Sequence, residues 1–296
     1  LSLRYDRVTN KLDDHLKAGG VDLSSDVAYK KATGRLGVTW NPQPDFSLYA
    51  RWGTGFLPPG TEELVNNPYA YGGFNTYLVP AKSNGEEVGA RGSISNSFIY
   101  DLALFYLETS NDFGRYRMAS RPLETFYGNV GSTTRYGLET FLSWYPIKSL
   151  ALRLAYTYSH FKYDSVQTLE AGVTYNNTWL PNSPQHQLCL DGEFRIAPAL
   201  TAGAALEYVS SWYIDATNRI LSNGYGRTDS YALVHLRLAY RFEMGKTPLE
   251  IMLSGRNIFG VEYYGFTEPD PDGNSYQPAP TAEWSVGLRV GIGKSE

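Results

Sequence analysis

Apolar and polar residues alternate along most of this chain, and the alternation has a period of two. In the segment 150–158, Leu, Leu, Leu, Tyr and Tyr occupy every second position, and smaller or charged residues such as Arg153 lie between them. A strict period of two is typical of a β-strand with one apolar face and does not fit an amphipathic helix. The same pattern returns at 200–208, 232–242 and 284–292. The chain therefore predicts an all-β fold.

We expect twelve strands of this kind, and most of them are long. They cover residues 2–10, 26–40, 46–54, 85–95, 98–114, 124–145, 149–163, 183–196, 199–214, 228–243, 248–265 and 281–293. Strands of soluble sheets usually have about five or six residues. Strands of about ten residues instead match the length needed to cross a bilayer at a tilt.

The connections between these strands alternate between short and long. The short ones are residues 41–45, 96–97, 146–148, 197–198 and 244–247. The long ones are about 11–25, 55–84, 164–182, 215–227 and 266–280, and the connection at about 115–123 is intermediate. All short turns then lie at one end of the sheet and all long loops at the other. This arrangement is typical of outer-membrane β-barrels, which have short periplasmic turns and longer external loops.

The two faces of the strands differ in a way that fits a membrane. One face carries Arg153, Glu207, His235, Arg237, Arg241, Glu283 and Arg289. Each Arg would cost about 2–4 kcal/mol at the bilayer midplane, so this face is expected to line the lumen. Tyr and Trp gather toward strand ends, as at Tyr49 with Trp52, which indicates interfacial aromatic girdles. A soluble all-β domain is the alternative that the mean hydropathy of −0.34 favours.

Composition removes several other classes of function. With 26 Lys and Arg against 30 Asp and Glu, the net charge is −4, which argues against nucleic-acid binding. The single cysteine, Cys189, cannot form an internal disulfide or a thiolate metal site. The four His residues lie on separate segments without a metal-ligand spacing. We expect neither a resident cofactor nor a metal site, and no run of 18 apolar residues indicates a transmembrane helix.

Five motifs follow one another along nearly the whole chain. They are Gly53-Thr54-Gly55-Phe56-Leu57-Pro58-Pro59 with Glu62-Glu63-Leu64, Gly85-Glu86-Glu87-Val88-Gly89-Ala90-Arg91, Asn129-Val130-Gly131 with Tyr136-Gly137-Leu138-Glu139, Leu180-Pro181-Asn182-Ser183-Pro184-Gln185-His186, and Asn257-Ile258-Phe259-Gly260-Val261-Glu262-Tyr263-Tyr264. In this order and spacing they resemble the C-terminal half of the TonB-dependent outer-membrane receptors.

The resemblance implies a fold, a location and a function. Barrels of this family have about 22 strands and a plugged lumen. Residues 1–296 would then be one domain, twelve strands of a larger transmembrane antiparallel β-barrel, with the plug, the TonB-contacting segment and ten strands expected upstream of Leu1. The receptor would lie in the outer membrane of a Gram-negative bacterium, in contact with lipid and lipopolysaccharide. Coupled to a periplasmic TonB-type protein, it would take up a ferric siderophore or a similar large scarce solute.

Two further expectations follow from the resemblance. Iron would be present only as part of a transported chelate, and the receptor would not be an enzyme. Family members usually end in an aromatic residue, whereas this chain ends Val290-Gly291-Ile292-Gly293-Lys294-Ser295-Glu296. We therefore expect either a short tail after the last strand or an atypical terminus.

Rings and arginines in the long connections are the candidate ligand-binding residues. Tyr69, Tyr71, Phe74 and Tyr77 lie in one loop, where they would form a rigid wall for a bulky chelate or would pack the loop on itself. Arg115, Arg117 and Arg121 with Tyr116 would bind an anionic chelate or lipopolysaccharide phosphates. Weaker candidates of the same kind are Arg219, Tyr225, Arg227, Phe266 and Tyr276.

Some alternatives stay open at this point. A self-contained twelve-stranded barrel would be a passive pore or an outer-membrane lipase, and it would pair its first strand with its last. Ser159 and His160 with Asp164 suggest a hydrolase site, but neighbours on a strand point to opposite faces. Within the receptor class, cobalamin and oligosaccharide are further ligands, and haem is disfavoured because residues 56–85 contain no His.

Overall fold

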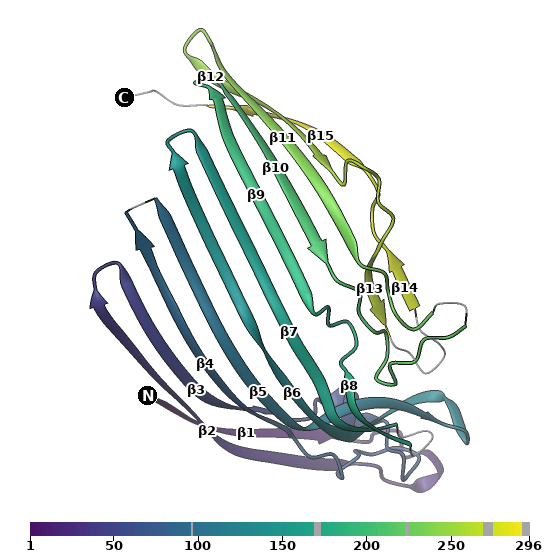
Figure 1. Cartoon of the computed structure of the whole chain (residues 1–296). Coiled ribbons are helices and arrows are strands. Elements are labelled where there is room, and N and C mark those ends of the chain that lie inside the picture. The colour runs from purple at the N-terminus through teal and green to yellow at the C-terminus, as the bar shows by residue number, and fades with distance from the viewer. Residues whose placement is uncertain (96, 169–172, 223–224, 269–274, 292–296) are drawn as a thin grey trace.

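The structure is a computed structural model that describes residues 1–95, 97–168, 173–222, 225–268 and 275–291, and its dominant feature is one large antiparallel sheet (Figure 1). Twelve strands follow one another in chain order across this sheet. They are β1 (Ser2–Leu12), β2 (Ser25–Gln43), β3 (Phe46–Leu57), β4 (Ala81–Ile94), β5 (Phe98–Met118), β6 (Arg121–Ile147), β7 (Leu150–Thr168), β9 (His186–Ala197), β10 (Leu200–Val209), β11 (Tyr231–Met244), β12 (Thr247–Arg256) and β15 (Glu283–Val290). The predicted twelve strands and the all-β class are confirmed.

The long connections carry small elements of their own. β8 (Val173–Trp179) pairs with β7, and β13 (Tyr264–Glu268) pairs with β14 (Ser275–Pro278) as a separate two-stranded sheet. A five-residue helix, α1 (Thr61–Val65), and a 3-10 turn at Ala18–Gly20 complete the set. Within the described residues, no helix has the length and apolar character that a membrane crossing would need.

Short turns and long loops lie at opposite ends of the bent sheet, as the sequence predicts. The turns after β2, β6, β9 and β11 consist of residues 44–45, 148–149, 198–199 and 245–246. In Figure 1 the turns lie at the upper left, whereas β8, β13 and β14 lie at the lower end with the long loops. In an outer-membrane barrel, the turn end would be the periplasmic end and the loop end would be the external end.

Several predicted strand ends are wrong, and side chains explain two of them. The predicted strand 248–265 stops at Arg256, because Asn257 adopts a φ of 46°, a left-handed conformation that Asn tolerates better than most residues. The predicted strand 199–214 stops at Val209, where the Trp212 backbone N–H turns to the Thr228 hydroxyl at 3.1 Å. The last strand was expected to reach residue 293, and residues 292–293 lie outside the described part.

Three connections also differ from their predicted form. The intermediate connection at 115–123 is a hairpin extension, because β5 and β6 continue their pairing to a turn at residues 119–120. The connection predicted at 164–182 contains β8 and the end of β7. The strand predicted from residue 85 begins at Ala81.

The predicted division into an apolar and a charged face is confirmed. On the apolar face Leu238 lies beside Leu253, and Leu253 lies beside Val286, which is 77% exposed. On the other face charged residues pair across strands: Arg153 with Asp191 at 3.0 Å, Arg237 with Asp191 at 2.6 Å, Arg241 with Glu250 at 2.7 Å, and Arg289 with Glu250 at 2.9 Å. On the same face the His235 imidazole lies 3.6 Å from the Glu207 carboxylate. A wide exposed apolar surface on one side of a sheet fits lipid, and the charged side then lines the lumen.

Tyr49 is an exception to the predicted aromatic girdle. Its ring lies 4.6 Å from the guanidinium of Arg51, which pairs with Glu87 at 3.6 Å. Tyr49 and Arg51 are two residues apart on β3, so both point to the lumen. The girdle assignment of Tyr49 is therefore wrong, whereas Trp52 lies on the apolar face.

The sheet is open within the described residues. β1 and β15 form its two edges, and they do not pair with each other. Figure 1 shows β1 and β15 at opposite edges of the bent sheet, well apart from each other. The pairing that a self-contained twelve-stranded barrel requires is therefore absent from this part of the chain, which goes against the pore or lipase alternative.

Candidate ligand-binding site

The candidate residues all lie at the external end of the sheet, in two groups. The first group belongs to the β3–β4 loop, residues 58–80, and to the tip of the β5–β6 hairpin. The second belongs to the β10–β11 connection and to the β13–β14 hairpin. Each group depends on contacts that fix its loops.

A small apolar core holds the β3–β4 loop together. Phe74 is only 4% exposed and packs with the buried side chains of Leu64 and Leu78. Its backbone N–H also donates to the hydroxyl of Ser25 on β2 at 2.9 Å. The structure thus places Phe74 in the packing of the loop and not on a surface that a ligand could touch.

Asparagine side chains fasten this loop to β6. The amide of Asn66 donates to the carbonyl of Thr125 at 2.7 Å. Asn129 on β6 accepts from the Val79 N–H at 3.0 Å and donates to the Val79 carbonyl at 2.8 Å. Asn129 belongs to one of the motifs found in the sequence, and its role as a clamp for the loop was not predicted.

Tyr127 adds a further contact between β6 and the loop. Its hydroxyl donates to the carboxylate of Glu62 on α1 at 2.8 Å. Burial, and then this carboxylate, raise the pKa of Tyr127 to about 12. The phenol therefore keeps its proton at physiological pH and stays a donor to Glu62.

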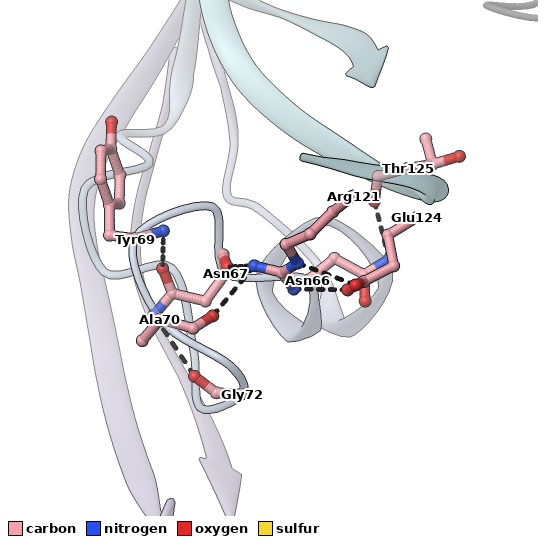
Figure 2. A network of polar contacts seen from close by, with 8 residues as sticks. All are labelled: Asn66, Asn67, Tyr69, Ala70, Gly72, Arg121, Glu124 and Thr125. Atoms are coloured by element: carbon pink, nitrogen blue, oxygen red, sulfur yellow. Dashed lines mark hydrogen bonds and ion pairs between the residues drawn. The ribbon is translucent and has the colours of Figure 1, made fainter. Parts of the chain in front are cut away.

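Arg121 is the central tether of the loop, as Figure 2 shows. Its guanidinium donates to the carbonyls of Asn67 at 2.8 Å and Ala70 at 3.1 Å. The same group pairs with the Glu124 carboxylate and lowers the pKa of that carboxyl. Only 10% of the Arg121 side chain is exposed. Its fork of donors is therefore directed at the loop, not at the space where a ligand would lie.

Three tyrosines of the loop face outward from this frame. Tyr69, Tyr71 and Tyr77 are 70%, 81% and 74% exposed. Tyr69 and Tyr77 meet edge to face with ring centroids 4.8 Å apart, and the Arg121 guanidinium lies 4.9 Å from the centre of the Tyr71 ring. Ring and cation contacts of this kind hold the tyrosines in place while leaving most of their surface open.

The hairpin tip reaches across to the second group. Arg115 on β5 pairs with Glu268 on β13 at 3.1 Å. Tyr116 is half-buried against the fully buried ring of Phe126, with centroids 5.7 Å apart. Arg117 donates to the carbonyl of Pro122 at 3.3 Å. The Arg115–Glu268 ion pair thus joins the two groups of candidate residues at the mouth.

The second group is a smaller aromatic cluster. The ring of Tyr276 lies 5.3 Å from that of Tyr225 and 5.0 Å from that of Tyr264. The Arg227 guanidinium lies 5.2 Å from the ring of Tyr213. Arg219 and Phe266 are exposed.

A buried polar network that the sequence did not reveal fixes the β13–β14 hairpin. The Thr267 backbone N–H donates to Asn182 at 3.1 Å, and the Trp212 indole donates to the Thr267 hydroxyl at 3.1 Å. These three residues come from three different connections. Asn182 was visible as part of a motif, but nothing in the spacing identified Thr267 as its partner.

The arrangement as a whole can bind a bulky, ring-bearing anion. It presents open tyrosine faces beside arginines, which suit flat rings and oxyanions. Among the described residues, no group of three His, Cys, Asp or Glu side chains could hold a metal ion.

A family model decides the class of protein. The model described as "TonB dependent receptor-like, beta-barrel" matches residues 1–258. This chain belongs to the TonB-dependent receptors. The predicted resemblance is therefore confirmed, and with it the outer-membrane location in a Gram-negative bacterium that the barrels of this family share.

Individual TonB-dependent receptors give the same fold. The chain is 24% identical over 240 residues to the probable TonB-dependent siderophore receptor PiuA of Acinetobacter baumannii. This match covers 78% of this chain and 30% of PiuA. The crystal structure of PiuA superposes with a TM-score of 0.75 at 19% identity, over 97% of this chain and 39% of that one. The crystal structure of unliganded FecA, a ferric citrate transporter, superposes with a TM-score of 0.74 at 19% identity. The superposition covers 97% of this chain and 42% of FecA.

The chain thus spans less than half the length of these receptors and matches the C-terminal part of their barrels. The resemblance to the solved structures concerns the fold of this part.

Proposed function

We propose that this chain is part of a receptor that takes up a ferric siderophore through the outer membrane. The observation that carries the proposal is the set of three exposed tyrosines, which a buried Arg121 tether holds at the external mouth of the sheet. Siderophores are large and oxygen-rich, and many carry flat rings. Rigid aromatic side chains bind such molecules at a small entropic cost.

The names of similar proteins support iron in a chelate as the cargo. PiuA is described as a siderophore receptor, FecA as a ferric citrate transporter, and BauA of Acinetobacter baumannii as the ferric preacinetobactin receptor. The copper transporter OprC shares the fold with a TM-score of 0.71, so the fold alone does not select iron. In this proposal the iron is cargo, the receptor needs no resident cofactor, and it has no catalytic step.

The proposal also assigns partners. The Leu- and Val-rich face would contact lipid, with lipopolysaccharide around the external rim. The charged lumenal face would contact a plug, and a periplasmic TonB-type protein would supply the energy for transport. The candidate residues that face the ligand would be Tyr69, Tyr71, Tyr77, Arg115, Tyr116, Arg117, Arg219, Tyr225, Arg227, Phe266 and Tyr276, while Phe74 and Arg121 would support them.

A double variant of the receptor tests this function. Cells that carry the Tyr71→Ala and Tyr77→Ala changes should bind radioactive ferric iron complexed by a tris-catecholate, a tris-hydroxamate or citrate about thirtyfold more weakly than wild type, because each exposed ring contributes about 1 kcal/mol. Leu123→Ala is the control, because Leu123 is 93% exposed at the neighbouring hairpin tip.

The outcomes separate the possible ligands. Equal binding by the double variant and the control would remove the tyrosines from the site. If wild-type cells bind none of the three ferric complexes, and production of the receptor responds to cobalamin or sugar supply but not to iron, the siderophore assignment fails.

A further inference from the structure

The lipid-facing side chains of β3 to β7 form rows across the sheet, and the rows change from apolar to aromatic toward the external end. The apolar row consists of Ala50, Val88, Leu104, Leu138 and Tyr158. The next row consists of Trp52, Glu86, Tyr106, Tyr136 and His160. Aromatic residues with a polar tip gather where hydrocarbon meets the lipid head groups. The row of Trp52 and the tyrosines therefore marks the external boundary of the hydrocarbon.

Beyond this boundary the lipid-facing side of the same strands is polar. The next row consists of Thr54, Asn84, Glu108, Thr134 and Lys162. The Trp52 indole donates to the Asn84 side chain at 2.8 Å, and the Tyr106 hydroxyl donates to the Glu108 carboxylate at 2.7 Å. The boundary residues thus hold the polar side chains that lie above them.

A hollow of about 360 Å³ lies among these polar side chains. The polar side chains around it are those of Lys82, Asn84, Glu108, Ser110, Ser132 and Asp164. Because side chains alternate along a strand, Glu108 and Ser110 share the lipid-facing side with Leu104. The hollow is therefore on the outer wall of the sheet, separate from the lumen and from the exposed tyrosines of the β3–β4 loop.

The charges around the hollow have a definite order across the strands. Lys82 is exposed on β4 at one side. Lys162 lies on β7 at the other side, and its ammonium donates to the Asn177 side chain at 2.9 Å. Between the two lysines are the carboxylates of Glu108 and Asp164. Ammonium groups bind phosphate oxygens, whereas carboxylates accept hydrogen bonds from hydroxyl and amide groups.

We propose that this hollow binds the phosphorylated sugar head group of a lipopolysaccharide molecule in the outer leaflet. Lipid head groups are the molecules that meet the outer wall of a barrel at this height. β4 and β7 are three strand spacings apart, about 14 Å, so Lys82 and Lys162 suit two phosphates at the ends of a disaccharide. The side chains between them suit the hydroxyl and amide groups of the sugars. A phospholipid, with one phosphate and a short head group, would use only one end of the hollow.

The inference rests on the part of the proposed function that surrounds the barrel with lipopolysaccharide, and the identity of the cargo does not enter it. It names one place on the outer wall where a single head group is held. Lipopolysaccharide that merely surrounds the barrel would respond to the total charge of the rim. The site predicts instead that the two lysines beside the hollow matter more than other outward-facing lysines.

Replacement of the two lysines tests the site in the full-length receptor. Wild-type receptor extracted from outer membranes in a mild detergent should retain lipopolysaccharide, which native mass spectrometry detects. Lys82→Gln with Lys162→Gln should lower the retained fraction about tenfold, because two charge-assisted contacts to phosphate are lost. Lys11→Gln with Lys30→Gln is the matched control on the outward face of β1 and β2, and it should change the retained fraction little. Equal loss from both pairs, or unchanged retention by K82Q/K162Q, would overturn the site.

A second measurement is made in whole cells and has its own control for assembly. A photoreactive benzoylphenylalanine replaces the ring of Phe56, which lies beside Lys82, or the outward-facing ring of Tyr5 on β1. The Phe56 position should crosslink to lipopolysaccharide, and K82Q/K162Q should reduce this product about tenfold while the Tyr5 product stays constant. A Phe56 product that contains phospholipid, or one that the lysine changes leave as it is, would overturn the site.

Uptake measured in parallel separates this inference from the proposed function. Cells with K82Q/K162Q should take up the ferric complex within about twofold of wild type, because the hollow lies outside the lumen. Absence of uptake by wild-type cells would overturn the proposed cargo and leave the lipopolysaccharide result unaffected.

Discussion

Arg121 shows how a charged residue at the mouth can matter for binding without touching the ligand. Its donors are directed at the Asn67 and Ala70 carbonyls and at Glu124. A lysine would keep the charge but could not make this forked set of contacts. We expect Arg121→Lys to weaken binding of the ferric complex about five- to tenfold and to expose the β3–β4 loop to protease. Wild-type affinity in the Lys variant would mean that charge alone is needed there.

The pairing of Arg121 with Glu124 also predicts a pH dependence. Arg121 lowers the pKa of Glu124 below its ordinary value of 4.5. A lowered carboxyl pKa stabilises the folded loop above the ordinary pKa, and this stabilisation is lost as the pH falls through the lowered value. Protection of the loop from protease should therefore be constant from neutral pH down to about 5 and should decline below about 4. Glu124→Gln is the control, and it should remove this step from the profile.

Single residues were the hardest part to predict from the sequence. The exposed rings of Tyr69, Tyr71 and Tyr77 follow from their place in a polar loop. Phe74 lies in the same stretch, yet it is buried, because Leu64 and Leu78 come together only when the loop folds. The partners of Arg121 are carbonyls about fifty residues away in the sequence, and no local pattern indicates them.

The β13–β14 hairpin is the element whose stability is easiest to test. Thr267 is fully buried and its hydroxyl accepts from the Trp212 indole. Replacing it by valine keeps the shape and leaves the indole N–H without this acceptor, which costs about 1–3 kcal/mol. We expect Thr267→Val to speed hydrogen exchange in the hairpin. Glu268→Ala removes only an exposed ion pair worth at most about 1 kcal/mol, and it should change the exchange little.

Elements were predicted well where alternation alone defines them. The centres of all twelve strands and both faces of the sheet follow from the period of two, because one side must accept lipid and the other a polar lumen. Strand ends depend on single contacts instead, such as the left-handed Asn257 or the turn of Trp212 toward Thr228. β8 and the hairpin extension of β5 and β6 pair without a strong apolar face, so alternation could not distinguish them from loops.

At the scale of the whole molecule, the unpaired edges of the sheet make a prediction about the native protein. Backbone N–H and C=O groups in hydrocarbon cost several kcal/mol each when they lack a partner, so a sheet cannot end at β1 and β15 inside a bilayer. We expect the outer-membrane polypeptide that contains this sequence to have an intact mass far above 33.1 kDa, with further strands that pair with both edges. Mass spectrometry of the native outer-membrane protein measures this directly. A mass near 33.1 kDa would require β1 to pair with β15 or with a second copy, and crosslinking of cysteines placed at Leu3 and Leu288, which both lie on the apolar face, would then locate the closing strands.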